Sequence, residues 1–112
     1  LASTLNEIAG DSEVAMLVYE NDVPVHEQVR GASEMLGYDI FQVANEGKMV
    51  AIVPAEQAEA ALKAMKASRY GADAAIVGEV LEGPSGRVSV KNGFGATRIM
   101  DTLVGEQLPR IC

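Results

Sequence analysis

The sequence predicts an α/β (α+β) domain built on a ferredoxin-like split βαβ sheet, with helices packed mainly on one face. Three observations favour this class. Apolar residues occur either in short continuous runs, as in buried strands, or at helical spacing. The segments follow one another as strand, helix, strand, strand, helix, strand, which is the split βαβ order. Glycine and proline stand at the boundaries between them, where chains turn.

The first part of the chain is expected to form a helix, a strand and a second helix. Residues 2–9 fit a short helix that Gly10 ends. Residues 13–19 are a mostly apolar run, which is typical of a buried strand. Residues 26–36 carry apolar side chains at helical spacing, and Gly37 is expected to stop that helix.

The middle of the chain predicts a hairpin and a third helix. Residues 39–44 and 49–53 are expected as two strands, joined by a tight turn at 45–48. Pro54 suits the first turn of a helix, so we expect a helix over 54–68. Its inward face would consist of four apolar residues at helical spacing: Ala58, Ala61, Leu62 and Met65.

The C-terminal part completes the sheet. Residues 74–81 are expected as the fourth strand, and the alternating segment 87–92 with the short segment 97–100 as a C-terminal strand pair. We therefore expect one body over residues 1–104 and a flexible tail over 105–112.

Composition narrows the function classes. The chain has 112 residues, enough for one domain, and a net charge of −7, which argues against nucleic-acid binding. Its single cysteine argues for a reducing compartment, so we expect a cytoplasmic protein. There is no run of about 18 apolar residues and no export leader, so no membrane association is expected.

The single cysteine is the last residue, Cys112, preceded by Pro109, Arg110 and Ile111. A thiol on a free chain end is suited to carry a chemical group between sites. From Gly105 the tail can extend roughly 23–25 Å, at about 3.3–3.6 Å per residue. The alternative is a chain that simply happens to end in cysteine.

A second candidate is the turn formed by Asn45, Glu46 and Gly47. A carboxylate at such a turn can act as a base or orient an amide, with the asparagine beside it and a glycine that admits a second group. The alternative is an ordinary turn with a solvated glutamate.

Two further features carry weaker signals. The pattern Gly93-X-Gly95-X-X-Arg98 is a poor phosphate cradle, and a bulge or a close backbone approach explains it better. His26 has no second histidine near it to form a metal site, so we predict no metal.

Four stretches together resemble a known family: residues 1–9, 29–32, 44–48 and, above all, the terminal Pro109-Arg110-Ile111-Cys112. They are similar to the C-terminal domain of the HypE family of nickel–iron hydrogenase maturation proteins. That family lies within the superfamily of aminoimidazole-ribonucleotide-synthetase-like (PurM-like) enzymes. The resemblance covers essentially the whole chain and implies a PurM C-terminal-domain-like fold.

The resemblance also implies a reaction. In this family the transferase HypF carbamoylates the terminal cysteine, and ATP-dependent dehydration converts the thiocarboxamide to a thiocyanate. The cyano group then passes to iron on the HypC–HypD complex. By this resemblance Cys112 carries the group, Glu46 binds or deprotonates the carboxamide nitrogen, and Asn45 and Gly47 help to bind it.

The same resemblance implies what lies elsewhere. Family members have an N-terminal domain that supplies most of the site for ATP with Mg²⁺ and the homodimer interface. We therefore expect this chain alone to bind no cofactor and to be inactive. Two alternatives stay open: a non-catalytic ferredoxin-like module for ligand binding or interaction, and a thiol carrier on which partners perform all the chemistry.

Overall fold

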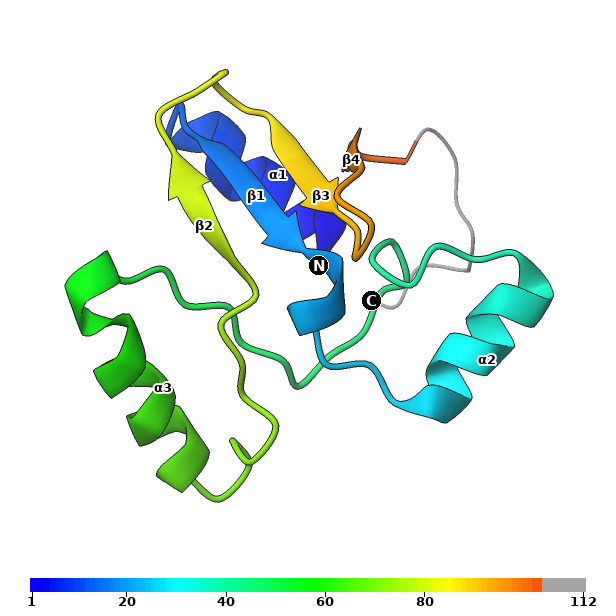
Figure 1. Ribbon diagram of the computed structural model, residues 1–112, viewed down its shortest axis with the longest axis horizontal. Coiled ribbons are helices and arrows are strands. Elements are labelled where there is room, and N and C mark those ends of the chain that lie inside the picture. Colours follow the sequence, from blue (N-terminus) through cyan, green and yellow to red (C-terminus); the bar gives the residue numbers. More distant parts are fainter. Residues whose placement is uncertain (104–112) are drawn as a thin grey trace.

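The computed structural model describes residues 1–103 and contains, in that range, three α-helices and a four-stranded sheet (Figure 1). The elements follow in the order α1 (Ala2–Asp11), β1 (Ala15–Tyr19), η1 (Glu20–Asp22), α2 (Glu27–Leu36), η2 (Ala55–Gln57), α3 (Ala58–Ala67), β2 (Gly78–Leu81), β3 (Val88–Lys91) and β4 (Thr97–Ile99). The elements η1 and η2 are single turns of 3₁₀ helix.

The sheet has the strand order β2-β1-β3-β4. Strands β1 and β2 pair in antiparallel fashion, with Ala15 opposite Leu81, whereas β1 and β3 run parallel, with Met16 opposite Val88. Strands β3 and β4 form the antiparallel C-terminal pair that the sequence predicts. The sheet is therefore mixed.

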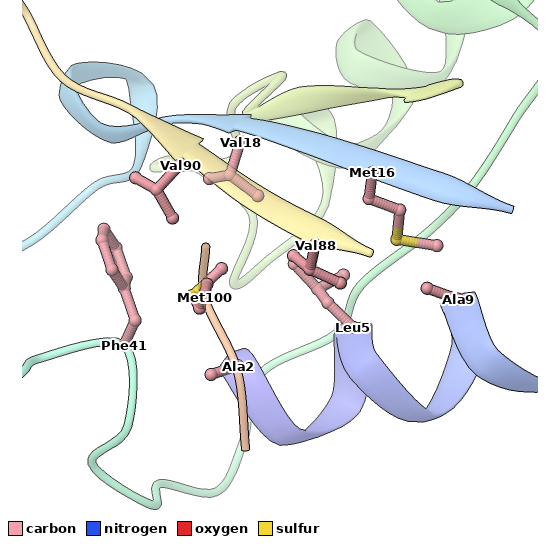
Figure 2. Packing of buried hydrophobic residues seen from close by; sticks show 9 residues of the cluster. All are labelled: Ala2, Leu5, Ala9, Met16, Val18, Phe41, Val88, Val90 and Met100. Atoms are coloured by element: carbon pink, nitrogen blue, oxygen red, sulfur yellow. The ribbon is translucent and has the colours of Figure 1, made fainter. Parts of the chain in front are cut away.

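The core lies between α1 and one face of β1 and β3 (Figure 2). The apolar stripe of α1 faces valines and methionine from the two strands because Leu5 and Ala9 fall one turn apart. Two residues from outside these elements, Phe41 and Met100, close the cluster and are 3% and 1% exposed. The full cluster consists of Ala2, Leu5, Ala9, Met16, Val18, Phe41, Val88, Val90 and Met100.

Three predicted helices are present. The first continues past Gly10 to Asp11, and the second ends at Gly37, which adopts the left-handed conformation with φ of 71°. Such a C-terminal glycine meets this conformation without a steric cost. The third begins with the turn η2 and continues as α3, whose half-buried residues are the four apolar positions that the spacing predicts.

The two strands predicted over residues 39–44 and 49–53 are wrong for the described structure, where both segments are irregular. In the first, the Asp39 carboxylate accepts a hydrogen bond from the Phe41 N–H at 3.0 Å, and the Asp39 carbonyl accepts one from the Gln42 N–H. These bonds form a turn in place of a strand. The place beside β1 that a split βαβ sheet would give to 49–53 belongs to β3.

The covering helix also differs from the expectation. Helix α1 covers the sheet, whereas α2 and α3 stand at opposite sides of the molecule in Figure 1. Ser33 is the one buried residue of α2, and α3 has none. The apolar faces of these two helices are thus only partly covered by residues 1–103.

Candidate functional site

Asn45, Glu46 and Gly47 lie on an exposed part of the surface, and the backbone bends at Glu46 and Gly47. Gly47 has a φ of 73°, a left-handed conformation that a glycine adopts at no steric cost. Within residues 1–103 the Glu46 side chain forms no hydrogen bond or ion pair. The structure has a bend here in place of the predicted hairpin turn, and the Glu46 carboxylate is accessible to a group that approaches from outside.

The bend is tied to the core a few residues earlier. The carbonyl of the buried Phe41 accepts a hydrogen bond from the Ala2 N–H at 2.9 Å, at the start of α1. The Gln42 side-chain amide donates to the Asp101 carbonyl at 2.7 Å. The chain that leads to Glu46 is therefore fixed both to α1 and to the segment that follows β4.

The segment that follows β4 is itself held in place by hydrogen bonds and by packing in the core. Met100 donates its N–H to the Val88 carbonyl at 2.8 Å and buries its side chain in the core. Its carbonyl accepts a hydrogen bond of 2.7 Å from the Asn6 side-chain amide, which also donates to the Ala2 carbonyl at 2.9 Å. We call Met100 and Asp101 the tail root, because the chain continues from them through residues 102 and 103 to residues 104–112.

The predicted tail residues Pro109, Arg110, Ile111 and Cys112 lie outside the described residues, as does the boundary predicted at 104. Chain length still limits where the thiol can go. Eleven residues from Asp101 to Cys112 span at most about 36–40 Å, and four residues from Gln42 to Glu46 at most about 13–14 Å. Since Gln42 contacts Asp101 directly, the covalent reach of the thiol exceeds the distance to Glu46.

Arg98, the cation of the glycine-rich pattern, is engaged inside the domain. Its guanidinium lies 3.4 Å from the Asp39 carboxylate, 3.9 Å from that of Glu20, and 5.8 Å from the centre of the Phe41 ring. These contacts satisfy its charge within the domain. Two carboxylate partners inside the domain disfavour a phosphate cradle at this pattern.

The two glycines of that pattern serve the turn between β3 and β4. The Asn92 side-chain oxygen accepts hydrogen bonds of 3.0 Å from the N–H groups of Phe94 and Ala96. A Cβ on Gly93 would lie 2.4 Å from the side-chain nitrogen of Asn21. Gly93 is therefore closely approached by the Asn21 side chain, and not by another stretch of backbone as the sequence suggested.

Sequence reasoning missed Asn6, Gln42 and Asp39, whose side chains organise the site. Asn6 gave one usable signal: it lies on the same helical face as Ala2 and Ala9, where an amide needs a buried partner. Gln42 and Asp39 gave none, because both fell in a predicted strand.

The described residues show neither a metal-binding cluster nor a membrane-spanning helix. Among residues 1–103 no three side chains of histidine, cysteine, aspartate or glutamate gather in a way that would hold a metal ion. His26 is exposed at the N-terminus of α2 and caps no backbone group there. No helix within that range has the length and apolarity to cross a membrane.

Comparison with known proteins decides the family. Residues 1–91 match the family described as AIR synthase related protein, C-terminal domain. The chain belongs to this family. Within it, the chain is 51% identical over all 112 residues to the carbamoyl dehydratase HypE of Azotobacter vinelandii and 37% identical over 110 residues to that of Escherichia coli K12. The resemblance to HypE stated from the sequence is confirmed.

Solved structures of this family agree with the fold. A crystal structure of the hydrogenase maturation protein HypE superposes on the whole chain with a TM-score of 0.91 and 44% identity. HypE in complex with ATP gives 0.91 and 43%, and a HypE–HypF complex gives 0.85 over 91% of the chain, with 42% identity. The mixed α/β fold class is therefore confirmed.

The chain covers only part of each relative's length. The chain spans 33% of the Azotobacter protein and 32% of the Escherichia protein. In the three solved structures it covers 37%, 35% and 33% of the matched chains. The family members that it matches are thus about three times as long.

Proposed function

We propose that this chain is the C-terminal domain of a HypE-like carbamoyl dehydratase that acts in nickel–iron hydrogenase maturation. The observation that carries the proposal is the 51% identity over all 112 residues to a protein of that name. The thiol of Cys112, together with an accessible carboxylate on a bend anchored beside the tail root, fits the chemistry of such an enzyme.

In the proposed reaction the Cys112 sulfur first accepts a carbamoyl group and becomes a thiocarboxamide. ATP then phosphorylates the carbonyl oxygen, and that oxygen leaves as phosphate while the nitrogen loses its two protons. The products are a thiocyanate on Cys112, ADP and phosphate. The step needs a base near the nitrogen and electrophilic assistance at the oxygen.

Glu46 is the base that we assign to this step, with Asn45 and Gly47 as binding groups. An ionised carboxylate accepts a proton from nitrogen, and the asparagine amide can hydrogen-bond the carboxamide. The bend at Gly47 leaves room for the approaching group because no side chain projects there. Pro109, Arg110 and Ile111 form the arm that delivers the sulfur, and the Arg110 cation favours its thiolate form.

Further parts of the reaction belong to the longer protein. A solved relative is described in complex with ATP, and another in complex with HypF. By analogy we propose that ATP, accompanied by Mg²⁺, binds mainly outside residues 1–112. HypF is the transferase that carbamoylates Cys112, the HypC–HypD complex receives the cyano group, and the full-length enzyme is a cytoplasmic homodimer.

The test is mass analysis of the full-length protein incubated with the transferase, carbamoyl phosphate and ATP. We expect one carbamoyl adduct, followed by loss of one water, and no adduct on the Cys112→Ala variant. Carbamoylation at another residue, with Cys112→Ala fully active, would refute the carrier role.

Glu46→Gln separates a catalytic carboxylate from a passive one. It should still accept the carbamoyl group but lose water about 10²–10⁴-fold more slowly. Glu59→Gln is the matched control, because Glu59 is an exposed carboxylate on α3. Dehydration at the normal rate in Glu46→Gln would mean that partners or other residues supply the base.

A further inference from the structure

Residues 43–53 form an unusual stretch of main chain. Among residues 1–103 no backbone hydrogen bond joins any of them to another residue, and none belongs to a helix or strand. Backbone N–H and C=O groups are almost always paired, either within the protein or with water. This stretch therefore presents an open set of donors and acceptors.

The second half of the stretch is also apolar and exposed. Met49, Val50, Ile52 and Val53 are 76%, 40%, 51% and 39% exposed, and Ala51 between them is exposed as well. Exposed leucines or valines occur singly on most proteins, but a contiguous apolar run marks an interaction site. No charged residue interrupts residues 49–53.

The sequence of this run favours a strand, although the described structure forms none there. Valine and isoleucine have high strand propensity because their branched side chains pack against neighbouring strands. That propensity is realised only when a partner strand supplies hydrogen bonds and side-chain contacts. Within residues 1–103 no such partner pairs with residues 49–53.

The relatives indicate where a partner is available. They match all of this chain at up to 51% identity, yet the match covers only 33% of their length. A solved relative has the same fold over the whole chain with a TM-score of 0.91, and 37% of its length is covered. About two thirds of such a protein lies outside the region that this chain matches.

We propose that residues 49–53 accept an extended, apolar β-strand from the part of the longer protein outside this chain. The inference rests on the proposed function only in taking the chain as part of such a longer protein. Main-chain hydrogen bonds would hold the added strand, and its alternate side chains would cover Val50 and Ile52 or Met49 and Val53. The added strand would satisfy the open backbone groups and remove the apolar run from water.

Hydrogen exchange measured by mass spectrometry tests the pairing. In the full-length protein, alternate amides of residues 49–53 should exchange at least about 100-fold more slowly than in the 112-residue chain, which has its own core. Equal, fast exchange in both proteins would overturn the proposal. Slow exchange in the 112-residue chain at every concentration would place the partner within the chain and overturn it too.

A pair of variants gives an independent readout. Ile52→Asp should lower the midpoint of thermal unfolding in the full-length protein by several degrees and leave that of the 112-residue chain within about one degree. Phe94→Asp is the matched control, since Phe94 is 99% exposed on the turn between β3 and β4, and it should change neither.

Two other results, one from the variants and one from hydrogen exchange with sedimentation, would contradict the proposal. An equal loss in both proteins for Ile52→Asp would mean that Ile52 packs within the 112 residues. Protection that rises with concentration, together with dimers of the 112-residue chain in sedimentation, would identify a second copy as the occupant. Neither measurement uses the dehydration reaction, so failure of the proposed function would not imitate failure here.

Discussion

The replacement of Asn6 by alanine tests how the tail root is held. Asn6 uses both hydrogens of its side-chain amide, one on the Met100 carbonyl at 2.7 Å and one on the Ala2 carbonyl at 2.9 Å. Each neutral hydrogen bond contributes about 0.5–1.5 kcal/mol, and a buried carbonyl without a partner costs about 1–3 kcal/mol. The Ala2 carbonyl sits in the first turn of α1, where a main-chain N–H can also reach it.

The destabilisation by Asn6→Ala should therefore come mainly from the Met100 carbonyl, which loses its hydrogen-bond donor. Alanine has the higher helix propensity, which returns up to about 0.7 kcal/mol in α1. The net expectation is a decrease of about 1–2 kcal/mol in the free energy of unfolding, which corresponds to roughly 5–10 °C in the unfolding midpoint for a domain of this size. Urea unfolding of the 112-residue chain, followed by circular dichroism, measures it directly.

The variant Asn6→Asp is a stricter test of the same two hydrogen bonds. It has the same shape, but an ionised carboxylate donates no hydrogen bond and repels both carbonyl oxygens. At pH 7 it should destabilise the chain more than Asn6→Ala does. Because the two carbonyl oxygens disfavour the ionised form, the lost stability should return as the pH falls toward about 4, the ordinary pKa of an aspartate, where the recovery is complete. A loss below about 0.5 kcal/mol for alanine, with no further loss for aspartate, would refute the role that we assign to the amide.

Two further predictions concern the sheet. In Gly78→Ala the added Cβ would lie 2.1 Å from the Leu17 carbonyl oxygen on β1, so we expect the free energy of unfolding to fall by at least about 1–3 kcal/mol. In Gly10→Ala the added Cβ meets nothing within 4 Å, so this change in α1 should instead raise the free energy of unfolding by about 0.5–1 kcal/mol in the same urea assay. Equal effects of the two changes would contradict this placement. Glu79 accepts a hydrogen bond of 2.9 Å from the Tyr19 hydroxyl and raises the pKa of Tyr19 above its ordinary value of 10.0. Because the folded state then holds this proton more tightly, the stability from the bond is complete below pH 10.0 and is lost as the pH rises through the raised pKa. Absorbance titration in a Tyr38→Phe, Tyr70→Phe background should show the pKa of Tyr19 falling in Glu79→Gln, and an unchanged titration would contradict the bond.

The sequence predicted the elements that are stabilised locally. Gly37 stops α2 as expected, because a left-handed C-terminal residue is a property of a few neighbouring residues. The spacing of Ala58, Leu62 and Met65 likewise marked the inward side of α3. Such features depend on backbone conformation within one or two turns.

The sequence did not predict which segments would pair. Residues 39–44 read as a strand, but the Asp39 side chain captures a backbone N–H and folds them into a turn. Residues 49–53 read as a strand and find no partner among residues 1–103. Pairing is a property of two segments, and strand propensity describes only one of them.

The candidate site divides in the same way. The chemistry-bearing residues Glu46 and Cys112 were suggested by residue type and position, and their roles stay predictions. The amides of Asn6 and Gln42, which fix the chain on either side of that chemistry, act across 94 and 59 positions of sequence. No local pattern signals contacts over such separations.

The parallel pairing of β1 with β3 has a consequence for how the chain folds. Met16 lies opposite Val88, so the central ladder cannot close until almost the whole body has left the ribosome. Closing so long a loop before any ladder contact forms is unfavourable in entropy and slows folding toward milliseconds or seconds. A chain truncated before Val88 would lack the centre of its sheet. The body therefore becomes native only late in synthesis, shortly before residues 104–112 emerge.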